Sequence, residues 1–244
     1  MTTLIKLFIS GFAALMLTSC DFNLQMGQIE GNGNVVTQDL NLTQDFTRVH
    51  SSNGWDVILE KGSSYKVVAE VDDNLLEYLD VHYEGSTLRI ESTDNSNIGN
   101  ASSRLIHVTY VQPLEAIKAS SASNITAAEV LTGDKINLDV SSAATVKLGL
   151  DIRDVEADAS SAGTLSLNGQ AQRLDFDASS AATINAKDLK AEFCNAEASS
   201  AGSIRTYVSK EITTNASSGG DIDYWGEPQQ VAVNESSGGS VSKK

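Results

Sequence analysis

The 244-residue chain has very few cysteines, prolines, histidines and aromatic residues. It contains two cysteines, two prolines and three histidines, and aromatic residues make up 6% of the total. A framework of several disulfides is therefore excluded, and packing must hold the fold together. No two histidines have zinc-binding spacing, and no glycine-rich loop leads into a helix, as nucleotide sites require. We expect no cofactor and no catalytic residue.

Positive charge is also scarce. Lysine and arginine total 17 against 32 acidic residues, which gives a formal net charge of −15. Nucleic-acid phosphates and anionic headgroups would be repelled, and no basic patch offsets the repulsion. Nucleic acid is therefore excluded as a partner.

A long apolar segment is missing as well, because the only candidate is the short run at residues 7–17, which follows Lys6. This length and flank are typical of a secretory signal rather than of a membrane span. The run ends in Leu17-Thr18-Ser19-Cys20, which resembles the lipobox of bacterial lipoproteins, where the cysteine receives lipid. The alternative is an ordinary signal beside an unrelated cysteine. We expect residues 1–19 to be a signal peptide, Cys20 to carry lipid, and residues 20–45 to form a tether and first strand.

What the sequence does contain is a repeat. From residue 120 onward, seven Ser-Ser pairs recur every 18 to 21 residues, whereas a flexible linker has no such period. The pairs begin at Ser120, Ser141, Ser160, Ser179, Ser199, Ser217 and Ser236.

Apolar residues stand five, three and one positions before most of these pairs, as in Ile136, Leu138 and Val140. A period of two indicates strands with one buried face. Another apolar residue returns five positions after the first serine, as at Val146. Each repeat therefore predicts a strand, a corner of small residues and a second short strand.

These repeats predict an all-β fold, a right-handed parallel β-helix with coils of about 19 residues. Such a period is too short for a strand-helix unit, so each strand should pair in parallel with its equivalent in the next coil. We assign residues 46–244 to a single domain. Within it, residues 46–113 form irregular N-terminal coils that cap the solenoid, with one helical turn at 72–79, and residues 114–241 form the regular repeats.

The serines themselves are interpreted as structural. Seven equivalent serines do not suit catalysis, which needs one activated nucleophile. Small side chains let the backbone turn tightly, while hydroxyls can bond along the stack, and the Ser-Ser-Gly-Gly corners at Ser217 and Ser236 allow positive φ. By the same alignment, Cys194 takes a strand position used by Ile136 and should be a buried, inert thiol.

The chain also resembles a known family. "NLLEYLDVHYEGSTLRI", "VTYVQPLEAIKASSASNI", the iterated Ser-Ser-Ala/Gly corner and "YWGEP" are similar to the head GIN domain of auto-transporter adhesins and bacterial lipoproteins, over about residues 46–241. The resemblance implies a right-handed β-helix and an adhesin-like role, and it brings no catalytic motif.

One feature of the surface stands out. Two positions before successive Ser pairs stand Asp139, Asp158, Asp177 and Glu197, which should form an outward column with neighbours about 4.8 Å apart. A second column, Asn137, Glu156, Asp175 and Asn195, should run beside it. Such oxygens could gather Ca²⁺, or the column is simply a solvated face.

Three functions remain open. The first is a non-enzymatic, lipid-anchored binding or adhesion module that presents flat faces to a glycan or surface protein. The second is a polysaccharide-processing enzyme using Asp158, Asp175 and Asp177, although an acidic surface would repel an acidic polymer. The third is a structural envelope protein that assembles end to end through its last coil. The first is favoured, in the outer membrane of a bacterial cell envelope, and no oligomeric state follows from the sequence.

Overall fold

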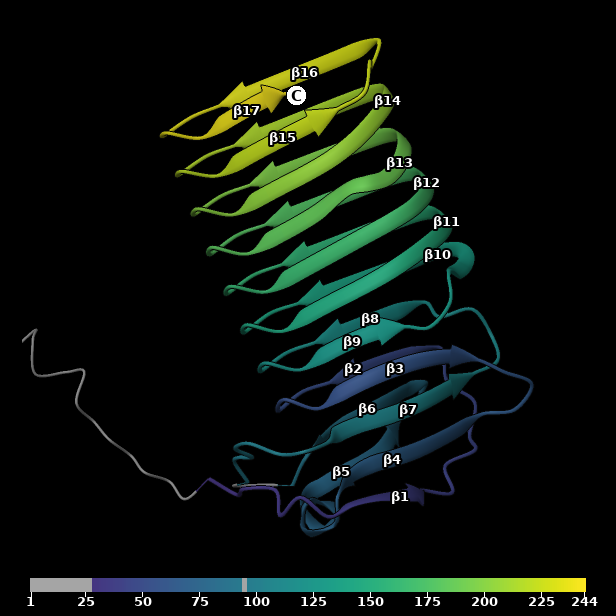
Figure 1. Ribbon diagram of the computed structural model, residues 1–244. Helices are drawn as coiled ribbons and strands as arrows, with labels where there is room; N and C mark the ends of the chain where they lie inside the picture. The colour runs from purple at the N-terminus through teal and green to yellow at the C-terminus, as the bar shows by residue number, and fades with distance from the viewer. Residues whose placement is uncertain (1–27, 94–95) are drawn as a thin grey trace, which may run out of the picture.

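The computed structural model describes residues 28–93 and 96–244, and its secondary structure is almost entirely β. The predicted β-solenoid is confirmed, with about seven turns spaced about 19 residues apart (Figure 1). The right-handed sense of winding stays a prediction. Among the described residues, no helix is both long and apolar enough to cross a membrane.

The strands are β1 (Val35–Asp39), β2 (Arg48–Ser51), β3 (Asp56–Lys61), β4 (Lys66–Asp72), β5 (Leu79–Glu84), β6 (Thr87–Ser92), β7 (Arg104–Tyr110), β8 (Ala116–Ala119), β9 (Asn124–Ala127), β10 (Leu131–Val140), β11 (Thr145–Ala159), β12 (Thr164–Ala178), β13 (Thr183–Ala198), β14 (Ser203–Ala216), β15 (Asp221–Trp225), β16 (Gln230–Glu235) and β17 (Ser240–Lys243).

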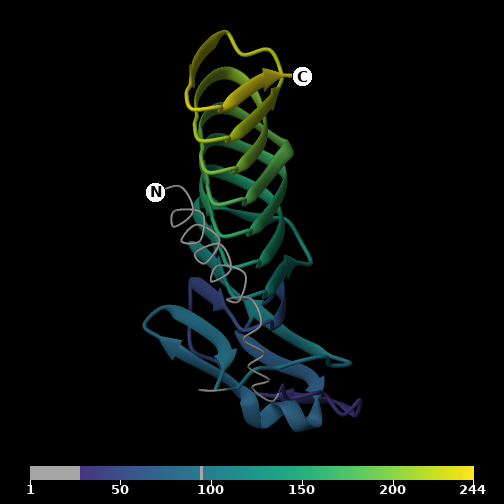
Figure 2. The same ribbon diagram turned by 90° about the vertical axis from the view of Figure 1, so that its left-hand side faces the viewer.

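Each coil in the middle of the stack is one long bent strand. The strands β11, β12 and β13 each run from one Ser-Ser corner to the next, where the sequence predicted two strands per repeat. They pair in parallel and mostly in register, so Asp158 of β11 lies beside Asp177 of β12. The ladder continues through the bend opposite the corner, which merges the two predicted segments. Figure 2 shows the two sides of each coil facing each other.

The interior is filled by the predicted period-two residues. Ile136, Leu138 and Val140 are at most 2% exposed, and their equivalents in the next four coils are also buried. Phe176 is the largest residue at these positions, and its register neighbours Ala157 and Ala196 are small. The volume of one large side chain is thus balanced by small ones above and below it.

Every Ser-Ser corner is a tight turn with two successive residues at positive φ. Between β10 and β11, Ser142 and Ala143 have φ of 50° and 60°. The N–H of Ala144 donates to the carbonyl of Ser141 over 3.0 Å. The hydrogen bond from residue i+3 to residue i, across two residues at positive φ, makes this corner a tight β-turn.

Positive φ is therefore not confined to the glycine-containing corners, although a non-glycine residue in this region costs about 1–2 kcal/mol. Backbone hydrogen bonds along the stack offset the strain. The N–H of Ala143 donates to the carbonyl of Ser161 in the next coil over 3.0 Å, and the N–H of Ala162 does the same to Ser180. The link between these corners is thus made by the backbone, where sequence analysis had considered the serine hydroxyls.

The N-terminal half enters the stack out of chain order. The coil of β2 and β3 lies between that of β6 and β7 and that of β8 and β9 (Figure 1). Its turn includes Asn53 and Gly54, with φ of 59° and 76°, so it repeats the corner geometry without the repeat sequence. Asn-Gly is a favoured pair for this turn.

Antiparallel strands cover the N-terminal end of the stack. The strand β4 pairs with β1 and β7, and β5 pairs with β6. The predicted helical turn is a 3-10 helix, η1 (Asp73–Tyr78). The side chain of Asp72 accepts backbone hydrogen bonds from Gly33, Ser102 and Ser103. The bond from Gly33 is the largest cause that holds the pKa of Asp72 below its usual range.

The C-terminal end of the stack is open. Val231 and Val233 of β16 hold positions that are interior in earlier coils, yet they are 47% and 49% exposed. The next such position is occupied by Glu235, whose carboxylate accepts a hydrogen bond from the N–H of Val241. A charge at this position discourages further strand pairing. The end-to-end assembly considered above stays a prediction.

Candidate functional site

Outward side chains of β10 to β14 form three rows that run along the stack. Because the strands pair in register, each coil contributes one residue to each row. Row A consists of Lys135, Asp154, Arg173, Phe193 and Glu211; row B of Asn137, Glu156, Asp175, Asn195 and Thr213; and row C of Asp139, Asp158, Asp177, Glu197 and Asn215.

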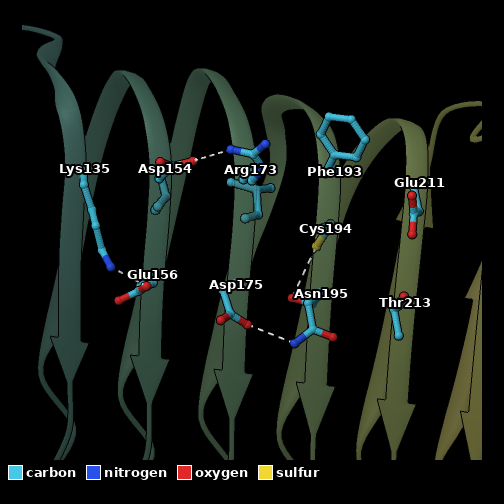
Figure 3. Close-up of a pocket in the computed structure, with 12 residues that line it drawn as sticks. Lys135, Asp154, Glu156, Arg173, Asp175, Phe193, Cys194, Asn195, Glu211 and Thr213 are labelled. Atoms are coloured by element: carbon cyan, nitrogen blue, oxygen red, sulfur yellow. Dashed lines mark hydrogen bonds and ion pairs between the residues drawn. The ribbon is translucent and has the colours of Figure 1, made fainter.

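Row A and row B, apart from Asn137, line a shallow groove of about 470 Å³ (Figure 3). The groove crosses five successive coils, from Lys135 on β10 to Thr213 on β14. Its direction follows the stack, so a ligand lying in it would cross the strands at steps of about 4.8 Å. This shape suits an extended molecule better than a compact one.

Most charges in the groove are paired across neighbouring coils. Lys135 Nζ lies 2.5 Å from Glu156 Oε1, and Arg173 Nη1 lies 3.5 Å from Asp154 Oδ1. Asp154 also accepts from Arg153 Nε over 2.9 Å, and this hydrogen bond is the main cause that lowers the pKa of Asp154. Asp175 and Glu211 have no ion-pair partner among the described residues, so two cations face four carboxylates and the groove keeps a net charge of −2.

The one aromatic side chain of rows A and B is Phe193, which is only partly buried. Its ring stands out from β13 in Figure 3. Arg173 Cζ lies 5.8 Å from the ring centroid, and Lys210 Nζ lies 5.6 Å from it. Cations at this distance are attracted to the ring quadrupole and hold the ring in place. The result is an apolar platform beside hydrogen-bonding groups.

Row C is more acidic than the groove. Asp139 is paired with Lys118 at 2.7 Å, which removes one charge from the row. The pKa of Asp158 is raised, first by burial and then by the charges of Asp177 and Asp139. The predicted column of carboxylates is therefore in register and mutually repulsive.

Comparison with known proteins identifies the family. The sequence pattern described as "Putative auto-transporter adhesin, head GIN domain" matches residues 45–228. The chain belongs to the head GIN domain family. No protein with a curated functional description matches it.

Solved structures similar to this GIN domain have the same fold. A Bacteroides fragilis protein described as a "putative adhesin" has 17% identity and a TM-score of 0.80, covering 88% of this chain and 100% of that one. A Parabacteroides merdae "putative adhesin" has 20% identity and a TM-score of 0.69, covering 89% and 99%. A "putative lipid binding protein" from Parabacteroides distasonis has 20% identity and a TM-score of 0.65, covering 89% and 99%.

The sequence of the GIN domain predicts rows B and C but not row A. Members of row A stand six positions before each Ser pair, which is the next outward position of the same period. Row A could not be predicted because its five members have different side-chain chemistries. The groove shows that these side chains lie on one surface.

The other predicted residues have different outcomes. Cys194 is 5% exposed at the base of the groove, and burial raises the pKa of its thiol to about 12, as an unreactive thiol requires. The predicted lipidation site, Cys20, lies outside the described residues. The carboxylates considered for catalysis are distributed between two rows, with Asp175 in row B and both Asp158 and Asp177 in row C.

Row C contains no ready-made cation site. Within residues 28–93 and 96–244, the only three His, Cys, Asp or Glu residues with closely grouped ligand atoms are Asp80, His82 and Glu91, on β5 and β6. The Ca²⁺ hypothesis for Asp139, Asp158, Asp177 and Glu197 therefore stays a prediction.

Proposed function

We propose that this GIN domain is a non-enzymatic binding module of the bacterial cell envelope and that the groove of rows A and B binds an uncharged glycan. The observation that carries the proposal is the partly exposed ring of Phe193, set among carboxylates, cations and the amide of Asn195. The adhesin descriptions of the family and of similar structures support a binding role.

The chemistry of the groove suits a sugar chain. The C–H faces of sugars are apolar and pack on aromatic rings, while their hydroxyls both donate and accept hydrogen bonds. Asn195 and Thr213 can do both, and Arg173 donates only. The net charge of −15 disfavours an anionic polymer, so an uncharged glycan is the better fit.

A glycan array tests the proposal with the full chain. We expect binding of an uncharged oligosaccharide that falls at least tenfold in Phe193→Ala, because the apolar platform is lost, and that survives in Phe193→Tyr, which keeps a ring. Lys147→Ala is a control, since Lys147 is exposed on the part of β11 that follows the corner and lines a different hollow.

Two outcomes would contradict this reading. Equal binding by the native chain and Phe193→Ala would place the ligand elsewhere. Cleavage of the bound glycan would instead support the polysaccharide-processing alternative, and Asp158→Asn, Asp175→Asn and Asp177→Asn would then be compared for loss of turnover.

The proposal includes display of the domain by a lipid on Cys20, in the outer membrane. The support is the apolar segment that ends in Leu17-Thr18-Ser19-Cys20. We expect Cys20→Ala to move the protein from the membrane fraction to the soluble fraction of its own cells, because the anchor is lost. Cys194→Ala is the matched control and should stay with the membrane, since Cys194 is buried in the solenoid. Unchanged fractionation of Cys20→Ala would refute the anchor.

A further inference from the structure

The hairpin of β5 and β6 brings one imidazole and two carboxylates together. These residues are distant in sequence from those that line the groove. Asp80 and His82 are two residues apart on β5 and therefore point to the same face. Glu91 of β6 lies directly opposite Asp80 in the antiparallel register. One ligand atom from each residue lies within 4.8 Å of those from the other two. Antiparallel pairing thus assembles a group that is dispersed in the sequence.

The distances within the group suit a small cation. His82 Nδ1 lies 3.2 Å from Asp80 Oδ1. Two ligands of a tetrahedral zinc ion, each about 2.0–2.1 Å from the metal, are about 3.3 Å apart. The pair can therefore ligate one ion with little movement, once the ion replaces the proton that the two atoms share as a hydrogen bond.

The third ligand is held by Arg89, which lies directly opposite His82 in the hairpin register. Arg89 Nη2 donates to Glu91 Oε2 over 2.9 Å, and Arg89 Nη1 donates to Glu84 over 3.1 Å. A carboxylate has two oxygens, so Oε1 of Glu91 stays available to a metal. Such an outer partner orients a ligating carboxylate. The side chains of Asp80, His82 and Glu91 are 46%, 42% and 26% exposed, which leaves access from solvent.

We infer that Asp80, His82 and Glu91 form a binding site for a divalent transition-metal ion of the zinc class, with its remaining coordination position open to water or to another ligand. Imidazole with carboxylate favours such ions over Ca²⁺, which prefers six or more oxygens. The site is independent of the proposed glycan groove and of row C.

Calorimetric titration of the full chain with Zn²⁺ at neutral pH tests this inference. We expect uptake of one ion by the native chain and a loss of affinity of at least tenfold in His82→Ala. His107→Ala is the matched control: His107 lies 3.6 Å from Glu60 and 3.5 Å from Glu70, yet belongs to no three-ligand group among the described residues. Its uptake should equal that of the native chain.

Two further variants keep the test decisive if His82→Ala disturbs the hairpin. Glu91→Gln preserves size but removes a charged ligand, and it should weaken uptake. Arg89→Gln breaks the ion pair with Glu91 while keeping all three ligands, so uptake should persist and should weaken less than in His82→Ala. Absorption of Co²⁺ in place of Zn²⁺ would report the coordination geometry. No saturable uptake at millimolar Zn²⁺, or equal affinity in the native chain, His82→Ala and Glu91→Gln, would overturn the inference.

Discussion

Replacing Phe176 with alanine is expected to lower the free energy of unfolding by about 3–5 kcal/mol. Phe176 is 1% exposed, and its register neighbours in the two adjacent coils are Ala157 and Ala196. Alanines cannot extend into the space that the ring leaves, and the backbone ladders on either side prevent the coils from closing in. The cavity therefore stays open, and the free energy of unfolding falls by the full cost of an unfilled cavity. Chemical denaturation of the two proteins measures the difference.

Phe193→Ala is the matched control for this prediction. It removes the same side chain from the outer face of the adjacent coil, where the ring is only partly buried. We expect the free energy of unfolding to fall by about 1 kcal/mol or less. Similar losses in the two variants would show that Phe176 is not confined between alanines as the structure describes.

Gly169→Ala is expected to destabilise the solenoid by about 3 kcal/mol, from strain and a backbone clash together. Gly169 has φ of 112°, a region that favours glycine. An added Cβ would lie 2.1 Å from the carbonyl oxygen of Leu150 in the preceding coil, and that oxygen belongs to a rigid ladder. The coils must separate locally, so amide hydrogen exchange should quicken around Leu150 as the midpoint of unfolding falls.

Gly133→Ala provides the comparison, since both residues lie inside a long strand. A Cβ at Gly133 would meet Pro113 Cβ at 3.5 Å, which is ordinary van der Waals contact. We expect a change within about 0.5 kcal/mol. If Gly169→Ala were equally mild, the bend of β12 would tolerate a side chain and the close approach of the coils would be wrong.

The repeat made the regular part of the fold predictable. Alternation of Ile136, Leu138 and Val140 identified a buried face, and recurrence of the Ser-Ser pair identified stacked coils. Both signals are local, so they need no knowledge of distant contacts. The bend opposite the corner was not predicted, because the ladder of hydrogen bonds carries each strand through it without a turn sequence that recurs from coil to coil.

The left-handed backbone of the corners could not be predicted from the sequence. Ala143 has a φ of 60°, although such a conformation is usually signalled by a glycine. The conformation persists because its N–H bonds to the Ser161 carbonyl of the next coil, a contact that only the stack provides. At the corner of Asn53 and Gly54 the turn itself is predictable, because Asn-Gly favours it. What the sequence does not predict is the position of this corner between two coils formed by later residues.

The candidate site was predictable in part. Asp175 and Asn195 were expected on one outward column because the period of two assigns a face to every residue. Phe193 was not, because the residues at its position in the other coils share no chemistry and its role depends on Arg173 and Lys210 beside it.

By itself the sequence determined the architecture: a period of about 19 residues with two-residue alternation specifies coils, a buried face and an outward face. Only the tertiary structure decided which outward residues share a groove and that Asp80, His82 and Glu91 meet. The reason is that burial depends on local pattern, whereas a site depends on the register and order of strands. In this chain β2 and β3 lie between coils formed by later residues, and antiparallel pairing places Glu91 opposite Asp80.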